Sequence, residues 1–352
     1  MRMVLTGRRC LEIQNNNKPE KNGKGGVRLR VLYCAICRTD AKMWDQGHRD
    51  LILPRVPGHE MAVADSRGKR YVIWPGVSCG TCAHCRAGRE NRCERLQILG
   101  FHRDGGFADE IIAPAESLIP VAETLDPAIS CFAEPMGCIF HALANFPVKK
   151  NPRFLIYGGG TMGLLAGLVI QAAGGKPMII EKNKEKIQAA GPFLRATGIA
   201  CTTNTSENGF DAVINACPDT RAFADGLKKL RKGGHFVFFS GLTKNATIET
   251  DLIDLIHYHE ITISGSYGLA PADMQRAVDF LDAHQRILAT LVQGIAAPEN
   301  APVLLPEVLA GKGFKYILDF TGSLSGKYHG QNHQGNFSPI IVHPKSGILD
   351  GQ

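Results

Sequence analysis

The stretch RFLIYGGGTMGLLAGLVIQAAGG, residues 153–175, decides the fold of this chain. It reads as a β-strand, a glycine turn and an apolar helix. Its glycines have the spacing G-x-G-x-x-G, in which the first permits a tight turn, the second lets backbone approach a pyrophosphate and the third allows close packing of helix on strand. The N-terminus of the helix would face the anion. We therefore predict a dinucleotide-binding turn formed by Gly158, Gly160, Thr161, Met162 and Gly163.

An acidic residue ends the next predicted strand, PMIIE (177–181). Glu181 follows the last glycine of the motif at a distance close to the roughly 20 residues expected of the acid that binds the cofactor ribose. A carboxylate there would accept hydrogen bonds from both ribose hydroxyls and would repel a 2′-phosphate. The pattern therefore favours NAD over NADP, although the neighbouring cations Lys182 and Lys184 weaken that preference.

Strands and helices alternate along the segment that follows the glycine motif. This alternation is typical of a parallel, doubly wound α/β sheet, and we assign residues 146–285 to such a Rossmann domain. The strands are expected at 209–217, 233–241 and 260–266, and the helices at 183–197, 219–231, 250–259 and 271–284.

The N-terminal part of the chain has a different pattern. Residues 1 to about 140 read as short strands and loops, with strands at 27–37, 69–76 and 107–114 bounded by Gly and Pro. A chain of 352 residues is long enough for two domains. We predict a β-barrel catalytic domain over residues 1–145, completed by residues 286–320, and leave the structure of the tail 321–352 open.

Four cysteines crowd into CGTCAHCRAGRENRC (79–93), with the spacing C-x2-C-x2-C-x7-C. The odd total of eleven cysteines and the absence of an apolar signal sequence argue against a secreted disulfide framework. An iron–sulfur run would be C-x2-C-x2-C-x3-C-P, whereas Glu94 follows the fourth cysteine here. Tetrahedral zinc fits better. Four thiolates leave no open position, so we predict a closed, structural zinc site on Cys79, Cys82, Cys85 and Cys93.

A second candidate metal site is formed by the motifs CRTD (37–40) and GHE (58–60). Cys37, His59 and Glu60 supply a thiolate, an imidazole and a carboxylate. Together with a water in the remaining position, this set is what a catalytic zinc needs. A cysteine and a histidine alone would favour a structural role. The presence of another metal site and a dinucleotide fold in the same chain favours the catalytic interpretation.

These motifs together resemble the zinc-dependent medium-chain dehydrogenases, the superfamily of alcohol, sorbitol and threonine dehydrogenases. The similarity runs from about residue 27 to residue 320. It also includes GFHRDGGFADEI (100–111), AEPMGC (133–138) and HYHEITISGSYG (257–268). The polyol and threonine branch is most similar, because its members carry Glu after the motif His and an EP motif. The cysteine lobe matches the structural zinc of the family.

The resemblance implies a ligand set for the catalytic zinc. Cys37, His59 and a carboxylate would hold the metal. Glu60 and Glu134 would both lie beside it, and either one could displace the other or the water. Asp40 would bind His59 and so determine which ring nitrogen carries the proton.

The resemblance also implies a path for the proton of the alcohol. Thr39 would pass this proton outward. In the family a histidine often stands two residues after the motif Asp as the outer relay, but Lys42 occupies that place here. The path beyond Thr39 is therefore left open. The segment after GHE is shorter than in the family, which indicates a trimmed barrel loop, and the tail has no recognised counterpart.

The expected reaction follows from the resemblance. Zinc would bind the substrate oxygen and lower the pKa of the alcohol, and the alkoxide would give hydride to the nicotinamide. The expected substrate is a secondary alcohol on a polyol, cyclitol or amino alcohol. An anionic alcohol, for example a phosphorylated one, is an alternative, because Arg38, Lys42 and Arg103 could surround the cleft; Arg38 could equally bind the cofactor pyrophosphate.

Two other classes of function were weighed. A non-catalytic dinucleotide sensor or scaffold would not need an open zinc site. A nucleic-acid-binding zinc protein is disfavoured because the net charge of +7 is scattered and no aromatic stripe accompanies it. No apolar run approaches the roughly 20 residues of a membrane span. We expect a cytoplasmic homodimer or homotetramer with no membrane or nucleic-acid partner.

Overall fold

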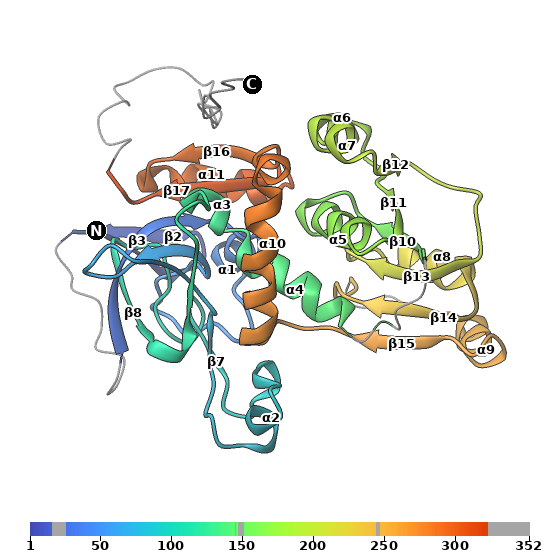
Figure 1. The fold of residues 1–352 in the computed structure, drawn as a ribbon, viewed down its shortest axis with the longest axis horizontal. Coiled ribbons are helices and arrows are strands. Elements are labelled where there is room, and N and C mark those ends of the chain that lie inside the picture. The colour runs from blue at the N-terminus through green and yellow to red at the C-terminus, as the bar shows by residue number, and fades with distance from the viewer. Residues whose placement is uncertain (16–25, 145, 147–150, 244–246, 323–352) are drawn as a thin grey trace, which may run out of the picture.

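The computed structural model describes residues 1–15, 26–144, 146, 151–243 and 247–322, and every structural statement concerns these residues. Two large sheets organise the chain. A mainly antiparallel sheet carries the N-terminal part, and a parallel sheet with helices on its faces carries the strands between residues 153 and 265 (Figure 1). The predicted fold class, a β-barrel catalytic domain beside a doubly wound Rossmann domain, is confirmed.

The parallel sheet has six strands in the order β12-β11-β10-β13-β14-β15. All five pairings are parallel. Strands β11 and β12 follow β10 on one side of it. The chain then crosses to the other side of β10, where β13, β14 and β15 follow in order. The crevice at this reversal is where such sheets bind dinucleotides. The strands are β10 (Arg153–Tyr157), β11 (Lys176–Ile180), β12 (Ala200–Thr202), β13 (Phe210–Asn215), β14 (Leu230–Phe238) and β15 (Thr262–Gly265).

Helices connect these strands as the alternating pattern predicted. The helix expected at 183–197 is instead two helices, because Pro192 has no N–H to donate and starts a new first turn. The helix expected at 271–284 continues to Ala289. The helices are α5 (Thr161–Ala172), α6 (Lys184–Ala189), α7 (Gly191–Thr197), α8 (Thr220–Lys229), α9 (Thr250–Tyr258) and α10 (Pro271–Ala289).

The second large sheet has the order β16-β17-β3-β4-β5-β9, and β8 also pairs with β3. The long strand β3 pairs with β4, β8 and β17, so the segment after residue 286 completes the sheet begun by the N-terminal part. The strands are β3 (Gly26–Ala35), β4 (Glu60–Ala64), β5 (Arg70–Ile73), β8 (Glu110–Pro114), β9 (Leu118–Pro120), β16 (Val292–Ala296) and β17 (Lys315–Asp319).

Helices also occur where the sequence predicted only strands and loops. Cys37 caps α1 (Arg38–Gln46): its sulfur accepts from the backbone N–H of Thr39, and the Asp40 carboxylate accepts from the backbone N–H of Cys37. The apolar face of α4 (Ala133–Leu143) is buried, and α4 packs against α5 and α10. The reading of residues 1–140 as strands and loops was therefore wrong at these places. The other helices are α3 (Pro127–Ser130) and α11 (Ala301–Leu309).

The remaining elements are short. A hairpin joins β1 (Arg2–Gly7) to β2 (Cys10–Gln14). The cysteine lobe, residues 76–98, lies between the paired strands β6 (Gly76–Val77) and β7 (Gln97–Ile98), and its α2 stands away from the sheets (Figure 1). Within the described part of the chain, no helix combines the length and apolarity that crossing a bilayer requires. The lobe and loops also contain α2 (Ala83–Arg86), η1 (Glu90–Arg92), η2 (Ala115–Ser117) and η3 (Pro298–Asn300).

Candidate functional site

Cys37, His59 and Glu60 meet where α1 begins and β4 begins. One ligand atom from each residue lies within 4.8 Å of the others. His59 and Glu60 are buried, with 5% and 1% of their surface exposed. A thiolate, an imidazole and a carboxylate converging at this distance are three of the four ligands of an open zinc site. The sequence-based prediction of a cluster is thus matched by the geometry, and the donor set fits zinc.

Asp40 holds two of these candidate ligands in place. Its Oδ2 accepts from the Cys37 backbone at 2.9 Å, and its Oδ1 accepts from the Gly58 backbone at 3.2 Å. The same Oδ1 lies 3.4 Å from His59 Nδ1, without the alignment of a hydrogen bond. Burial lowers the pKa of His59, but the charges of Asp40 and Cys37 outweigh burial and raise this pKa well above its ordinary value. The site therefore has an excess of negative charge, which a metal cation would neutralise.

Lys315 forms a buried ion pair with Glu60. Its Nζ lies 2.5 Å from Glu60 Oε2, and the two side chains are 5% and 1% exposed. Burial lowers the pKa of Lys315, but the charge of Glu60 outweighs it and keeps this pKa above its ordinary value, so the amine is charged. Sequence reasoning missed Lys315, which lies on β17 and 255 residues from Glu60. A charged residue opening the apolar strand KYILD was the available signal.

Glu134 approaches the same site from the first turn of α4. Its Oε1 accepts from Cys138 Sγ at 3.6 Å. Burial raises the pKa of Glu134 to about 7, the charge of His59 opposes this shift and the charge of Glu60 adds to it. Glu134 therefore neighbours both residues, although it is not one of the three whose ligand atoms converge.

The polar residues of α1 differ in how far they are exposed to solvent. The Thr39 backbone donates to Cys37 Sγ at 3.4 Å, and Thr39 is only partly exposed, so it stands beside the candidate metal ligands. Lys42 is exposed. Arg38 is also exposed and donates to the carbonyl of Leu309 at 3.4 Å. Helix α1 thus places Thr39 beside the candidate metal ligands and leaves Arg38 and Lys42 exposed.

The glycine turn after β10 requires glycine for steric reasons. Gly158 has φ of +106°, a conformation that side chains rarely adopt. A Cβ on Gly163 would lie 1.8 Å from the carbonyl oxygen of Gly158. A Cβ on Gly160 would meet only the end of the Lys186 side chain, at 3.3 Å. The turn is therefore closely packed against backbone at Gly163, whereas space remains at Gly160. A pyrophosphate can approach the N-terminus of α5 through this space.

Glu181 lies beside this turn at the end of β11. Its Oε2 accepts from the Gly159 backbone at 2.9 Å. Lys186 Nζ lies 3.7 Å from the same carboxylate, whereas Lys182 pairs with Asp219 at 3.0 Å. The cation nearest the turn is thus Lys186, which the sequence interpretation did not name.

The helix that follows the turn is tied to the other domain. The Thr161 hydroxyl donates to the carbonyl of Phe314 at 2.7 Å, across the domain junction. Its side chain is therefore engaged, and only its backbone N–H would face a cofactor. Met162 is partly buried against the core of the parallel-sheet domain, so it supports the turn from behind.

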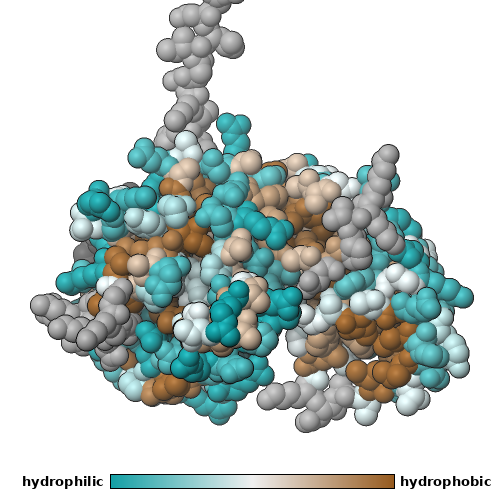
Figure 2. All heavy atoms as spheres, turned by 60° about the horizontal axis from the view of Figure 1, so that its bottom comes forward, coloured by the Kyte–Doolittle hydropathy of each residue, from teal (hydrophilic) through white to brown (hydrophobic). Residues whose placement is uncertain are grey.

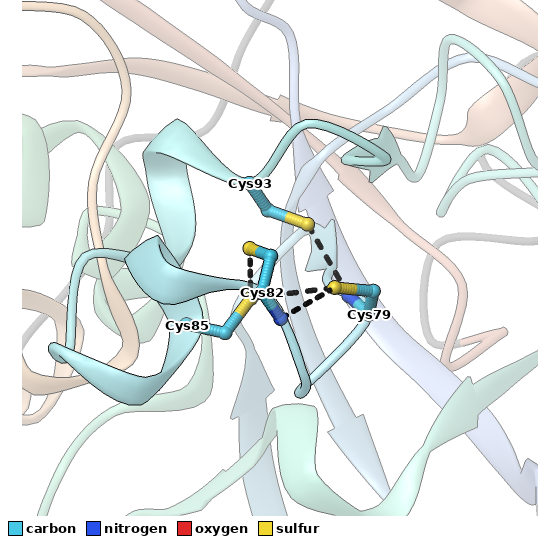
Figure 3. Close-up of side chains that lie close together, drawn as sticks. All are labelled: Cys79, Cys82, Cys85 and Cys93. Atoms are coloured by element: carbon cyan, nitrogen blue, oxygen red, sulfur yellow. Dashed lines mark hydrogen bonds between the residues drawn. The ribbon is translucent and has the colours of Figure 1, made fainter.

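The four cysteines of the lobe point toward one another (Figure 3). Their sulfur atoms lie within 4.8 Å of one another. Cys82 Sγ and Cys85 Sγ are 3.5 Å apart, far longer than the roughly 2.05 Å of a disulfide. Backbone N–H groups of Thr81 and Cys82 lower the pKa of Cys79 to about 5, which favours the thiolate that metals bind. The geometry fits one tetrahedral ion held by Cys79, Cys82, Cys85 and Cys93.

A cavity of about 460 Å³ lies between the lobe and the parallel sheet. Arg49, Arg92 and Tyr267 line it, whereas the cations Arg38, Lys42 and Arg103, which the sequence suggested for the cleft, do not. Arg103 instead donates to Gln97 at 2.6 Å. The sequence carried no signal for this difference, because distant segments form the cavity.

Comparisons with known proteins agree with this geometry. A family model described as "Alcohol dehydrogenase GroES-like domain" matches residues 23–123, and one described as "Zinc-binding dehydrogenase" matches residues 161–283. The chain is 27% identical over 293 residues to the L-galactonate-5-dehydrogenase of Escherichia coli, covering 77% of this chain and 84% of that protein. It is 28% identical over 305 residues to the sorbitol dehydrogenase of Halalkalibacterium halodurans, covering 78% and 86%.

A solved structure extends the likeness to the fold. The crystal structure of a zinc-binding dehydrogenase from Sinorhizobium meliloti 1021, bound to NADP, superposes with a TM-score of 0.80. It is 26% identical to this chain and covers 90% of this chain and 98% of that one. The likeness thus spans both domains.

Proposed function

The chain belongs to the zinc-dependent medium-chain dehydrogenases, in the polyol dehydrogenase branch, and from this premise we propose that it oxidises a secondary alcohol of a polyol-type substrate with a nicotinamide dinucleotide. The observation that carries the proposal is the convergence of Cys37, His59 and Glu60 within 4.8 Å. A carboxylate on α4, Glu134, neighbours this cluster, and α4 also contacts β4, the strand that begins with Glu60. The arrangement supports chemistry in the cleft between the two domains.

We assign the metal to Cys37, His59 and Glu60. A zinc ion held there would act as a Lewis acid on the substrate oxygen, and the bound nicotinamide would accept the hydride. Glu60 supports the assignment over Glu134 because it belongs to the converging set. Lys315 holds one oxygen of Glu60, and Asp40 holds the Cys37 and Gly58 backbones, so both residues orient ligands without touching substrate.

Thr39 is proposed as the group that takes the proton of the alcohol. It lies next to Cys37 in sequence and its backbone contacts the Cys37 sulfur. A threonine hydroxyl both accepts and donates, so it can take a proton on one side and release another. Lys42, one turn further along α1, is exposed and stands on the solvent side of such a path.

The cofactor is proposed to bind across the glycine turn, with its ribose on Glu181. We propose a preference for NAD, because the Glu181 carboxylate repels a 2′-phosphate, although the Lys186 amine lies 3.7 Å from it. The ratio of kcat/KM for NAD and NADP measures this preference. Glu181→Ala should shift the ratio toward NADP, and Lys186→Ala should shift it toward NAD. A wild-type enzyme that uses NADP better would contradict the assignment.

The proposed activity is tested by following reduced nicotinamide at its absorbance band while hexitols, pentitols, cyclitols and amino alcohols are supplied with NAD or NADP. Oxidation of at least one class with saturable kinetics supports the proposal. Dinucleotide binding without turnover of any class, in protein that contains two zinc ions, would instead support the non-catalytic sensor.

We also propose that the chain forms a homo-oligomer through the open edge of the parallel sheet. Strand β15 ends the sheet order, and Ile253, Tyr258 and Ile263 near this edge are exposed by 57%, 73% and 39%. Among the apolar patches on the face drawn in Figure 2, one lies at the lower right, on the side where α9 and β15 lie. An exposed edge strand with apolar neighbours is a template for pairing. Light scattering should give a dimer or tetramer, and Ile263→Lys should reduce the mass.

The thiols support a reducing compartment, such as the cytoplasm. All eleven cysteines are free in the structure, and four of them converge in the lobe. In an oxidising compartment these sulfur atoms would form disulfides in competition with the metal.

A further inference from the structure

The cavity of about 460 Å³ described above has two walls of different origin. Phe239 and Ser266, which follow β14 and β15, form one wall at the carboxyl ends of the parallel strands. Arg49, which follows α1, and Arg92, in the cysteine lobe, form the other. Its volume is that of a site for a small molecule, roughly 300–1,000 Å³.

Two connections relate this cavity to the candidate metal ligands. Glu134 beside the metal site and His141 in the cavity wall are seven residues apart on α4, hence on one face of the helix and about 10 Å apart along its axis. The ring of Phe101 packs at 5.3 Å from the His59 ring and at 5.5 Å from the ring of His48, the neighbour of Arg49. The cavity therefore lies about 10 Å from the candidate metal ligands, within the length of a small substrate.

Hydrogen bonds of partly buried side chains hold the cavity wall together. Both ring nitrogens of His141 are engaged, Nδ1 with Asp273 at 2.8 Å and Nε2 with Asn91 at 3.0 Å. Asn91 also donates to the carbonyl of Tyr267 at 3.2 Å. Because Asn91 precedes Arg92, this network positions the backbone of Arg92 beside the cavity. His141 and Asn91 thus act as positioning residues.

The positive charge in the cavity is only partly compensated. Arg49 lies over the Tyr267 ring at 5.8 Å and contacts Asp50 at 3.4 Å, so it is partly neutralised. Arg92 has no acidic partner among the residues that the structure describes, and no carboxylate lines the described cavity. The cofactor pyrophosphate does not account for this positive charge. The glycine turn that would bind it follows β10, and β10 lies two strands, or about 10 Å, from β14.

We propose that Arg49 and Arg92 form an anion subsite for the far end of the substrate, so that the preferred substrates are polyols with a terminal carboxylate or phosphate. This inference rests on the proposed dehydrogenase function. A carbon chain of five or six atoms spans about 6 Å, and the guanidinium groups bridge the rest of the roughly 10 Å to the metal site. Both guanidinium groups are exposed, so salt weakens their attraction for the anion.

The test compares matched substrates on the full-length enzyme. Hexitols, the corresponding hexonates and the hexitol phosphates are assayed on wild type, Arg49→Gln, Arg92→Gln and the double variant, at low and high KCl. Wild type should prefer one anionic set over the neutral hexitols, and the set that it prefers distinguishes carboxylate from phosphate. The double variant should lose about 10- to 100-fold in kcat/KM for that set only. Arg89→Gln, an exposed cation of the same lobe outside the cavity, is the matched control.

Equal use of neutral and anionic polyols by wild type would overturn the subsite and leave the proposed function intact. An equal loss on all substrate classes in the double variant would also overturn it. If no substrate class is oxidised, the proposed function fails. Calorimetric titration with gluconate then tests the anion subsite by itself, without turnover. Binding that weakens in the double variant but not in Arg89→Gln supports the subsite, and equal binding by all three proteins overturns it.

Discussion

Both groups of candidate metal ligands contain cysteine sulfur, but they differ in their other ligands and in the residues that support them. In the cysteine lobe, four sulfur atoms come from residues 79–93, and backbone N–H groups of the same segment donate to them. At the other site one sulfur meets an imidazole and a carboxylate, and residues 40 and 315 hold these ligands. A closed four-thiolate site can thus form from cysteines that are close in the sequence. An open site leaves one coordination position of the metal free, and its ligands need support from distant segments to stay in place.

The largest expected difference between the sites appears when one cysteine is removed from each. Cys37→Ser should lower kcat by ~10³-fold or more, because Lewis-acid catalysis supplies several kcal/mol to the transition state. The fold and the metal of the lobe should remain. Cys82→Ser should lower the melting temperature or solubility, because metal binding to such a segment is folding free energy. Metal analysis, kcat and thermal melting of both variants are the measurements.

Cys10→Ser is the control for this pair, because Cys10 is exposed and belongs to neither site. Activity lost by Cys82→Ser should parallel its unfolded fraction. A stable Cys82→Ser protein that has lost hydride transfer selectively would reverse the roles of the two sites. Iron with acid-labile sulfide in the lobe would contradict the zinc assignment itself.

A proton path should matter at the open site only. Thr39→Val should keep both metals and the cofactor but lose ~10²–10⁴-fold in kcat, the usual contribution of a positioned proton acceptor. Thr81→Val makes the same change beside the lobe, where the Thr81 hydroxyl lies 3.7 Å from Cys79 Sγ. This control should keep its kcat. Near-normal turnover by Thr39→Val would show that water or Lys42 takes the proton instead.

The buried pair of Lys315 and Glu60 should respond to the metal. Lys315→Met leaves Glu60 as a buried charge without its partner, which costs about 3–5 kcal/mol of unfolding free energy. A bound cation compensates part of that charge, so the loss should be larger in chelator-treated protein than in zinc-loaded protein. Urea unfolding with and without chelator measures both values.

The double variant Lys315→Met with Glu60→Gln is the control for this prediction, since it removes the unpaired charge together with its partner. It should recover part of the lost stability in the metal-free protein. A Lys315→Met protein with the same loss of stability in both metal states would show that Glu60 does not face the metal.

Asp40 should affect metal affinity at the open site and leave the lobe unchanged. Asp40→Asn removes the charge beside His59 and should weaken zinc binding about 10- to 100-fold at this site, the usual effect of changing a group that supports metal ligands. Competition with a zinc-binding dye measures the affinity of each site. Asp45→Asn is the control, because Asp45 lies on the same helix and pairs with Arg9. Equal affinity in both variants would contradict the role of Asp40.

Local patterns predicted much of the fold. The parallel strands and the helices between them follow from apolar runs separated by Gly and Pro, and the four-cysteine segment follows from its spacing alone. The helices α1 and α4, which carry the site, were missed. Helix α1 has a cysteine as its N-cap, which is not a usual capping residue, and α4 contains Pro135 and Gly137, which disfavour helix in isolation. Tertiary packing overrides these weak local preferences.

By itself, the sequence determined which chemical groups this protein has: the glycine turn with its acid, the four-thiolate lobe, and the thiolate, imidazole and carboxylate of the second site. These depend on residue type and on short spacing, which the chain preserves whatever it packs against. Only the tertiary structure decided that Lys315 pairs with Glu60 and that Arg49 and Arg92 share one cavity. Contacts between segments tens to hundreds of residues apart leave no periodic trace in the sequence, because folding rather than spacing brings them together.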